Sequence, residues 1–446
     1  HPLLAELPAS LEVKSFDHFY EEMESFPDVY EAIVAEIIKL AKQYKSICYA
    51  VPGHPFIAET TAPKIARKAK KLGIPVRVVS GMSFIEPAMA ALGVDLFPQS
   101  SVIDAIELSR EYHPQFPPSF PALITQIYSG EIANEVKLTL MAQYEDEHLV
   151  QLVHAAGTEN EVVEEMPLHA IDKSEHVGLL TCLYVPPIAE ASSFEEFQEL
   201  IAHLRAPEGC PWDREQTHQT LRRNLLEESY ELLEAIDHDD PNEIQEELGD
   251  LLLQVVLHAQ IANEYGEFRM SDVIRDIHSK LVGRHPHVFG DVEIENADGV
   301  KQRWEEIKAE ERRSKGGNTK GSLDGVSSAL PALAQAEAYG SRAARNGFDW
   351  PDVGGVLKKI DEEIEEIQES KNLSEAADEF GDLLFALVNF ARWKKIDPEV
   401  ALRETNARFK QRFAYVETKT REQGKALSDM SLEEMEALWQ EAKKVL

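Results

Sequence analysis

One acidic pattern occurs twice in this chain and restricts its fold more than any other feature. Residues 227–231 read EESYE and residues 247–250 read ELGD, while residues 362–366 read EEIEE and residues 379–382 read EFGD. In both copies, acidic residues three positions apart would lie on one face of a helix. Two such helices packed antiparallel would therefore point four carboxylates at one place.

Four carboxylates at such short range repel each other unless a cation lies among them. A site made only of carboxylate oxygens suits a hard ion such as Mg²⁺, with Mn²⁺ as a possible substitute. Such an ion can keep open coordination positions, and the oxygens of a polyphosphate can fill them. The pattern therefore predicts a divalent-metal site in each copy.

The length and charge of the chain limit the classes of protein to which it can belong. A chain of 446 residues is long enough for roughly three domains. Its formal charge of −35 argues against binding to DNA, RNA or an anionic membrane, although a bound metal ion would still allow nucleotides to bind. No apolar run is long enough to span a bilayer, no signal-peptide pattern is present, and the cysteines form no CxxC pair. We therefore expect a cytoplasmic protein with reduced thiols.

The chain changes character near residue 190. Before it, a helical pattern at residues 63–72 lies among four strand-like runs, at residues 47–51, 76–79, 122–127 and 177–185. This alternation predicts an α/β domain with a largely parallel sheet. After it, amphipathic helices are predicted at residues 194–204, 217–235, 242–264, 271–281 and 299–313, and again from Leu330 to the C-terminus.

Two local signals mark boundaries in the helical part. Asp240 and Pro241 predict a helix start, and Glu243 completes a capping-box pattern. The polar, glycine-rich stretch at residues 314–325 has the composition of a flexible linker. The helical part is thus expected to divide into two segments.

These two segments read as an internal repeat of one all-α module. GCPW at residues 209–212 parallels GFDW at residues 347–350, and WEEIK at residues 304–308 parallels WQEAK at residues 439–443. The acidic sets lie between these matches in the same order. The repeat also fixes the register of the second set, because EEIQE at residues 365–369 fits EExxE equally well.

Apolar residues follow each ExxD, at residues 251–257 and 383–388. We therefore expect Asp250 and Asp382 to lie beside buried positions, where an uncompensated carboxylate would be costly. A third EExxE, at residues 195–199, has no ExxD after it at a useful distance and is interpreted as an exposed helix face.

The helical stretches resemble the MazG family of nucleoside triphosphate pyrophosphohydrolases over roughly residues 195–446. The matching stretches are LRAPEGCPWDREQT, LLEESYELLEAI, EELGDLLLQVVLHAQ and RHPHVF in the first copy, and NGFDW, DEEIEEIQE, DEFGDLLFALVNFAR and NARFKQRF in the second. The resemblance implies an all-α protein, usually dimeric, that binds Mg²⁺. It also implies hydrolysis of an NTP or dNTP to the monophosphate and pyrophosphate.

Site residues follow from the resemblance by motif. The implied metal ligands are Glu228, Glu231, Glu247 and Asp250 in the first copy, and Glu363, Glu366, Glu379 and Asp382 in the second. Glu227 and Glu362 are candidates for orienting or deprotonating the water that attacks the α-phosphorus. Phosphate contacts are expected from Lys359, Arg408 and Arg412 in the second copy and from Lys280 and Arg284 in the first.

Two questions about the copies stay open. Trp304 and Trp439 could border a base or could pack a terminal helix. The first copy has Asn224 where the second has Lys359, and the second lacks the RHPHVF stretch. Because two-copy members of the family often rely on the C-terminal copy, we favour the second copy as the active one.

Residues 1–187 resemble the tetrapyrrole (corrin/porphyrin) methylase domain, which uses S-adenosylmethionine. The matching stretches are AVPGHP at residues 50–55, VVSGMS at residues 78–83 and KLTLM at residues 137–141. His54 stands in place of the usual aspartate and Ser80 in place of the usual proline, and the chain begins just downstream of the expected glycine-rich first strand. The resemblance implies a methylase-like fold, but these departures argue against methyl transfer.

The expected organisation has four parts: a methylase-like α/β domain at residues 1–187, a helical module at 192–313, a linker at 314–329 and a second helical module at 330–446. The expected function is Mg²⁺-dependent nucleoside triphosphate pyrophosphohydrolysis. Two alternatives are kept. One is a methyltransferase of the tetrapyrrole type with accessory helical modules, and the other is a nucleotide-binding protein without turnover.

Overall fold

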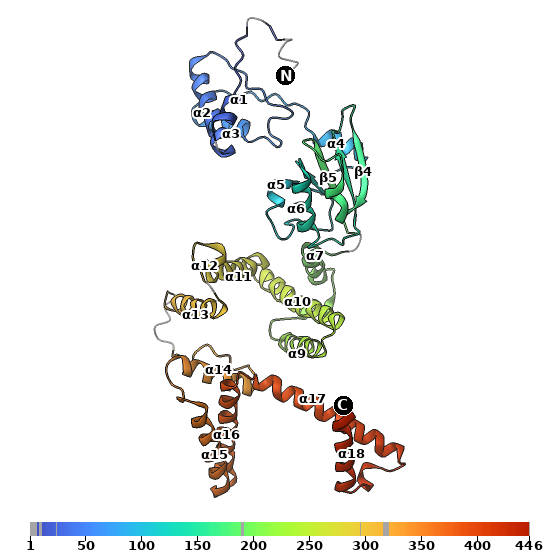
Figure 1. Cartoon of the computed structure of the whole chain (residues 1–446), viewed down its shortest axis with the longest axis vertical. Coiled ribbons are helices and arrows are strands. Elements are labelled where there is room, and N and C mark those ends of the chain that lie inside the picture. Colours follow the sequence, from blue (N-terminus) through green and yellow to red (C-terminus); the bar gives the residue numbers. More distant parts are fainter. Residues whose placement is uncertain are drawn as a thin grey trace. The chain divides into compact units, whose positions relative to one another are not determined.

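The computed structural model describes residues 7–8, 11–23, 25–188, 191–294, 296–314 and 321–445. The chain forms two compact units, residues 1–275 and 276–446. In the described part of the chain, an α/β domain with one sheet comes first, and the regular structure after it is helical (Figure 1). The expected fold class, an α/β methylase-like domain followed by an all-α region, is confirmed.

The sheet of the first unit is mixed and has five strands in the order β1-β2-β5-β3-β4. The strands are β1 (Ser101–Asp104), β2 (Ala122–Thr125), β3 (Leu149–His154), β4 (Val162–Pro167) and β5 (Thr181–Val185). Strands β1 and β2 are parallel, whereas the β2/β5, β5/β3 and β3/β4 pairs are antiparallel. The expectation of a largely parallel sheet was wrong, because β3 and β4 are joined by a short hairpin connection that allows only antiparallel pairing.

The core of this domain lies between the sheet and the helical elements α5 (Ala105–Leu108), α6 (Gly130–Leu140) and η2 (Leu168–Lys173). Three fully buried leucines or isoleucines on neighbouring strands, Ile124, Leu152 and Leu183, face this core in register. The α6 helix begins at Ser129, whose hydroxyl accepts a hydrogen bond from the backbone N–H of Ile132. Burial of these apolar side chains holds the helices against the sheet.

Residues 47–51 and 76–79, predicted as strands, are not strands in this fold. Within the part of the chain that the structure describes, neither segment has a strand partner. Both instead line a cavity of about 840 Å³, together with residues of α2 (Phe26–Gln43) and α3 (Thr61–Lys71). Apolar and β-branched composition favours a strand, but a strand forms only where a neighbour satisfies its backbone hydrogen bonds. The helices here also include α1 (Asp17–Glu22) and α4 (Ile85–Leu92).

The helical part of the first unit centres on an antiparallel hairpin. It contains α7 (Phe194–Arg205), α8 (Pro211–Glu215), α9 (Arg222–His238) and α10 (Pro241–Glu264). The α9 helix begins five residues later than predicted, because Thr217–Leu221 form a turn. A small core of Ile201, Leu221, Val256, Leu257 and Ile261 joins α7 to α10.

The start of α10 agrees with its sequence signal in part. Asp240 is the N-cap and accepts a hydrogen bond from the backbone N–H of Asn242, with Pro241 in the first turn. Glu243 does not complete a capping box, since its carboxylate lies 2.8 Å from Nδ1 of His238. Asp239 has φ of 54° and closes the tight connection between α9 and α10.

The described residues of the second unit form helices and no strand, and α11 (Met270–Arg284) crosses the boundary between the units. Helices α15 (Val353–Glu369) and α16 (Leu373–Trp393) form a second antiparallel hairpin, and Asn372 caps α16. The α17 helix (Pro398–Glu422) packs on α18 (Leu432–Val445) around a core of Val416, Met430 and Leu438. The expected linker lies partly outside the described residues, at 315–320. The unit also contains α12 (Pro286–Phe289), α13 (Ala297–Ser314), α14 (Ala332–Arg345) and η3 (Leu427–Asp429).

Candidate metal centres

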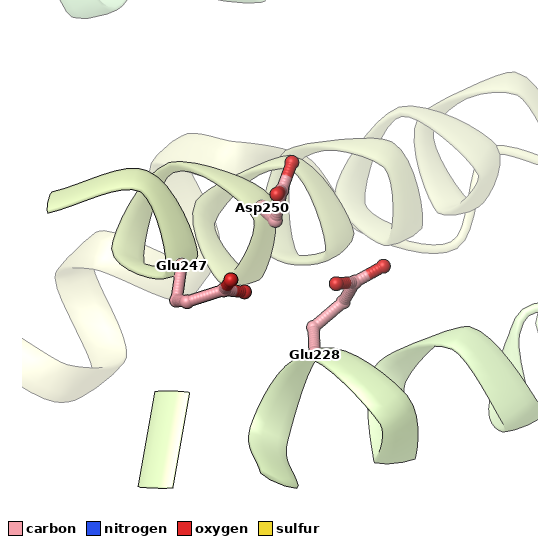
Figure 2. Close-up of side chains that lie close together, drawn as sticks. All are labelled: Glu228, Glu247 and Asp250. Carbon is pink, nitrogen blue, oxygen red and sulfur yellow. The ribbon is translucent and has the colours of Figure 1, made fainter. Parts of the chain in front are cut away.

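Three of the four acids of the first set converge between α9 and α10. Glu228 projects from α9 toward Glu247 and Asp250 on α10, and each of the three offers an oxygen within 4.8 Å of the others (Figure 2). The spacing of three positions between Glu247 and Asp250 places both on the helix face that meets α9. All three side chains are half-buried.

Two carboxyl groups of this cluster, those of Glu228 and Glu247, have raised pKa values. Burial, hydrogen bonding to Glu231 and the charges of Asp250, Glu231 and Glu247 raise the pKa of Glu228. Burial and the charges of Glu231 and Asp250 raise the pKa of Glu247. Glu231 is exposed and lies outside the three-residue cluster, but its charge still acts on both neighbours. A positive charge placed among these groups would relieve the repulsion.

The second hairpin gathers a corresponding set. Glu363 and Glu366 on α15 and Glu379 on α16 each offer an oxygen within 4.8 Å of the others. Burial, together with the charges of Glu366, Glu363 and Asp382, raises the pKa of Glu379. Glu363 is the most deeply placed of the acids, with only 1% of its surface exposed.

Asp382 does not join the second cluster. Its side chain is exposed, and the expectation that it lies beside buried positions was wrong. The apolar run that follows it is itself partly open, since Leu384 and Phe385 are 39% and 40% exposed. Only Ala386 and Val388 of this run are buried, because one face of α16 packs against α14 and α15 and the other does not.

Each cluster contains one carboxylate oxygen that is buried without a hydrogen-bond partner in the described part of the chain: Oε2 of Glu247 in the first and Oε2 of Glu363 in the second. A buried carboxylate oxygen without a partner is costly unless a proton or a cation compensates it. The donor atoms are all carboxylate oxygens, so both clusters fit a hard divalent cation.

In each hairpin a basic side chain forms an ion pair with an acid of the motif, but the two copies differ in which acids are paired. In the second copy, Nζ of Lys359 lies 2.7 Å from Oε1 of Glu362 and 2.6 Å from Oε1 of Glu363. Hydrogen bonds to both acids raise the pKa of this lysine. In the first copy, Nε of Arg223 lies 2.7 Å from Oε1 of Glu227.

The remaining residues expected in the second copy lie on α17 and α18. The guanidinium carbon of Arg412 is 6.0 Å from the centroid of the Trp439 ring, which is a cation–π contact. The Phe409 ring lies 5.1 Å from the same tryptophan, centroid to centroid. Arg408 is half-exposed and donates from Nη2 to Oγ1 of Thr405 at 2.8 Å.

The corresponding residues of the first copy are engaged with each other. Arg284 donates to both carboxylate oxygens of Glu311, and Nζ of Lys308 lies 3.6 Å from the centroid of the Trp304 ring. Lys280 is exposed. These residues belong to the second unit, whereas the first acidic cluster belongs to the first unit.

Two residues near these aromatic rings were not anticipated. Lys308 covers Trp304, and Phe409 packs against Trp439 and stacks on Phe413 at 6.1 Å. The spacing of four residues between Phe409 and Phe413 places both on one helix face, and this signal was available in the sequence. Lys308 follows Trp304 by the same four positions on α13, so this contact was also signalled by the sequence.

The glycine loops of the N-terminal domain differ from those with which the methylase family binds its cofactor. The ring of His54 turns back on its own loop, and its Nδ1 accepts a hydrogen bond from the backbone N–H of Phe56 at 3.1 Å. No carboxylate therefore stands at the position that the family fills with aspartate. The Gly53 and Gly81 loops pack backbone to backbone, since a Cβ on Gly81 would collide with the carbonyl of Gly53. These residues do not fit S-adenosylmethionine as the family binds it.

None of the described helices is long and apolar enough to cross a membrane.

Fold and sites together define a protein in which an α/β methylase-like domain precedes helical hairpins that carry carboxylate clusters suited to a divalent cation. Comparison with protein families agrees with this description. The MazG nucleotide pyrophosphohydrolase domain matches residues 216–289, and the tetrapyrrole (corrin/porphyrin) methylases match residues 1–172. The MazG match lies within the first helical copy.

Individual relatives extend these matches. The uncharacterized protein YabN of Bacillus subtilis is 42% identical over 457 residues, which cover 99% of this chain and 91% of that protein. The nucleoside triphosphate pyrophosphohydrolase/pyrophosphatase MazG of Thermotoga maritima is 45% identical over 251 residues, which cover 56% of this chain and 95% of that protein. The nucleoside triphosphate pyrophosphohydrolase of Escherichia coli K12 is 43% identical over 251 residues, which cover 55% of this chain and 95% of that protein.

Among solved structures, uroporphyrin-III-C-methyltransferase from Thermus thermophilus superposes with a TM-score of 0.31 at 20% identity, covering 35% of this chain and 70% of that chain. The sequence matches, by contrast, span most of each relative. The chain belongs to the MazG family and carries a tetrapyrrole methylase domain at its N-terminal end.

Proposed function

We propose that this chain is a divalent-cation-dependent nucleoside triphosphate pyrophosphohydrolase, which converts an NTP or dNTP and water to the monophosphate and pyrophosphate. Relatives with that printed activity, at 43–45% identity, support the proposal. The observation that carries it is the convergence, in each hairpin, of three carboxylates within 4.8 Å. Each cluster also contains a buried carboxylate oxygen that has no partner among the described residues.

Mg²⁺ is the cation we assign to these clusters, with Mn²⁺ as a substitute, because the ligands are hard oxygen donors. In the second copy, Glu363, Glu366 and Glu379 would hold it, with Asp382 at the edge. In the first copy, the corresponding residues are Glu228, Glu247, Asp250 and, at the edge, Glu231. A bound divalent cation supplies positive charge that offsets the charge of a triphosphate.

The chain's own residues have distinct tasks in this reaction. Glu362 orients or deprotonates the attacking water, and Glu227 is its counterpart in the first copy. The water oxygen forms a bond to the α-phosphorus, the bond from that phosphorus to the bridging oxygen breaks, and pyrophosphate leaves with its electron pair. The proton released by the water passes to the carboxylate. Lys359, Arg408 and Arg412 contact the phosphates, and Trp439 borders the base.

The second copy is the one to which we assign turnover. Both copies place an arginine over a tryptophan, Arg412 over Trp439 and Arg284 over Trp304, but among the described residues Arg412 has no carboxylate within ion-pair distance. Arg408 pairs with Glu404 at 3.4 Å, and both of these side chains are about half-exposed. In the first copy, Glu311 neutralises Arg284 and Lys308 covers the Trp304 ring. A triphosphate would have to displace these intramolecular partners before binding there, which costs affinity.

We further propose that the chain forms a homodimer through its helical modules. Large apolar side chains are exposed on both hairpins: Leu248, Leu252 and Val255 on α10, and Phe380, Leu384, Phe385 and Leu387 on α16. An apolar surface of this kind on the helices that carry the clusters is typical of a protein–protein interface.

The test of the function is a product analysis. The purified protein is incubated with each NTP and dNTP and Mg²⁺, and pyrophosphate is separated from orthophosphate. Metal-dependent release of pyrophosphate and the monophosphate in equal amounts is expected. Release of orthophosphate alone, or release that does not depend on the metal, would contradict the proposal. No methyl-transfer step is proposed, because the loop at His54 does not fit the cofactor.

A further inference from the structure

Lys359 and the second acidic cluster share one carboxylate. Nζ of Lys359 lies 2.6 Å from Oε1 of Glu363, and Glu363 is also one of the three acids that converge within 4.8 Å. The side chain of Glu363 is 2% exposed, so water offers it little alternative solvation. Oε1 of Glu363 is therefore the oxygen that contacts the ammonium of Lys359. The buried Oε2 of Glu363 has no hydrogen-bond partner among the described residues.

An ammonium and a divalent cation compete at such a carboxylate. Two positive charges bound to the same buried group repel each other strongly, because few water molecules screen them. Lys359 is long, a third exposed and also paired with the exposed Glu362, so it can move outward when another anion is present. A triphosphate is such an anion, since its oxygens accept charge-assisted hydrogen bonds.

The first copy lacks this competitor. Position 224, which corresponds to Lys359, is asparagine. The neighbouring cation Arg223 pairs with Glu227. Glu228, the counterpart of Glu363, is surrounded by the charges of Glu231, Glu247 and Asp250. Among the described residues, no ion pair links a lysine or arginine to the three acids of this cluster, so a divalent cation that binds there does not compete with an ammonium.

We propose that Lys359 couples cation binding to nucleotide binding in the second copy: its ammonium weakens cation binding at Glu363 until a polyphosphate draws the ammonium away, whereas the first copy binds the cation without nucleotide. The inference rests on the proposed function and adds a regulatory role for one residue of that site. It also explains why a buried carboxylate in an active site would keep an intrahelical lysine four residues earlier.

The test measures the cation and the nucleotide separately. Mn²⁺ binding without nucleotide is followed by the loss of the free-ion electron paramagnetic resonance signal. Two full-length backgrounds isolate the copies: Glu228→Gln with Glu247→Gln leaves only the second cluster, and Glu366→Gln with Glu379→Gln leaves only the first. In the first background, Lys359→Gln is expected to tighten Mn²⁺ binding about tenfold, since it removes a competing charge.

Lys359→Gln should at the same time raise KM for an NTP at saturating Mg²⁺, because the lysine also binds phosphate. Lys359→Arg is the matched control that keeps the charge, and it should leave Mn²⁺ affinity near that of the parent. In the other background, Asn224→Lys should weaken Mn²⁺ binding about tenfold. Circular dichroism and thermal unfolding of every variant verify that it folds.

Lys359→Gln with unchanged or weaker Mn²⁺ affinity would overturn the inference, and so would Asn224→Lys without effect. Such results would leave the pyrophosphohydrolase proposal intact if NTP hydrolysis persists. Absence of Mn²⁺ binding in both backgrounds would contradict the inference and the proposed metal sites together. Opposite changes in Mn²⁺ affinity and NTP affinity are a signature that a purely structural lysine does not produce.

Discussion

Arg284 donates two hydrogen bonds to Glu311, from Nε to Oε1 at 3.2 Å and from Nη2 to Oε2 at 2.6 Å. Arg284 also lies near a tryptophan, with its guanidinium carbon 5.9 Å from the centroid of the Trp304 ring, and Arg412 of the second copy lies in the same way 6.0 Å from the centroid of Trp439. The two copies thus carry the same kinds of residue, but Glu311 neutralises the arginine beside Trp304, whereas among the described residues no acid pairs with the arginine beside Trp439; the second copy's ion pair, between Arg408 and Glu404, is looser and half-exposed. This difference is the structural basis for assigning different activities to the copies.

The first prediction concerns which copy hydrolyses the substrate. Glu366→Ala should lower kcat for NTP hydrolysis by more than about a hundredfold, because loss of even an indirect partner of a metal ligand costs about 10- to 100-fold. Glu228→Ala, which likewise removes one acid of the three-carboxylate cluster in the first copy, should lower kcat by less than about threefold, on the same scale of effects. Steady-state release of pyrophosphate measures both. Equal losses in the two variants would contradict the assignment of turnover to the second copy.

The second prediction concerns the tryptophan of each copy. Trp439→Leu should raise KM for an NTP about tenfold, since stacking of a base on an aromatic ring contributes about 1–3 kcal/mol. Trp304→Leu should leave KM unchanged, because Lys308 already occupies one face of that ring. Hydrolysis of inorganic tripolyphosphate, which has no base, separates a base contact from a structural effect. A Trp439→Leu variant impaired equally on both substrates would show that the ring packs α18 and does not border the base.

The sequence predicts the helical hairpins well because their signals are local. Asp240 and Pro241 mark the start of α10, and the spacing of the acids assigns them to one helix face. The sheet is predicted less well because strand pairing is not local. Residues 47–51 have the same apolar, β-branched character as β2, yet only β2 finds partners. Composition cannot indicate which neighbour a strand will meet.

The motif predicts which acids belong to each site, but it does not predict which of them converge in space. Glu231 and Asp382 belong to the same motif as their neighbours, yet both lie outside the clusters. A small rotation of one helix about its axis decides which three of four acids converge, and no sequence pattern specifies that rotation. The contact between Lys359 and Glu363 was equally hidden, because the spacing of four residues fits a surface ion pair as well as a buried one.

The third prediction concerns the loss of folding stability that the first acidic cluster causes when no cation is bound. Burial and neighbouring carboxylates raise the pKa of Glu228, so the folded protein holds this proton more tightly than the unfolded chain does. Ionisation of Glu228 therefore lowers stability above the raised pKa, and stability returns as the pH falls through that value. Glu228→Gln should raise Tm by a few degrees in EDTA at pH 8, measured by circular dichroism.

The control for this variant is Glu227→Gln, because Glu227 is exposed and paired with Arg223, and it should give no increase. Mg²⁺ should raise Tm of the parent protein and narrow or reverse its difference from Glu228→Gln, since a ligand stabilises the state that binds it. An unchanged Tm for Glu228→Gln in EDTA would mean that the cluster tolerates its charges without a cation.

The fourth prediction concerns the anchor between α7 and α10. The guanidinium of Arg205 donates from Nε and Nη2 to the two carboxylate oxygens of Glu264, at 2.8 Å and 2.7 Å, and the arginine side chain is only 4% exposed. The hydrogen bond from Arg205 lowers the pKa of Glu264 below its ordinary value of 4.5. Glu264→Gln should lower the free energy of unfolding of this helical part by about 1–3 kcal/mol at pH 7, because it leaves a buried charge poorly paired.

The dependence on pH distinguishes this ion pair from a simple packing effect. A lowered carboxyl pKa contributes stability above the ordinary pKa of 4.5, and that contribution is lost as the pH falls through the lowered value. The difference between the parent and Glu264→Gln in urea unfolding should therefore be full at pH 7 and shrink below pH 4.5. Glu267→Gln, at an exposed position just beyond α10, serves as the control and should behave like the parent at both values. A difference that persists undiminished in acid would show that Glu264 acts through its shape and not through its charge.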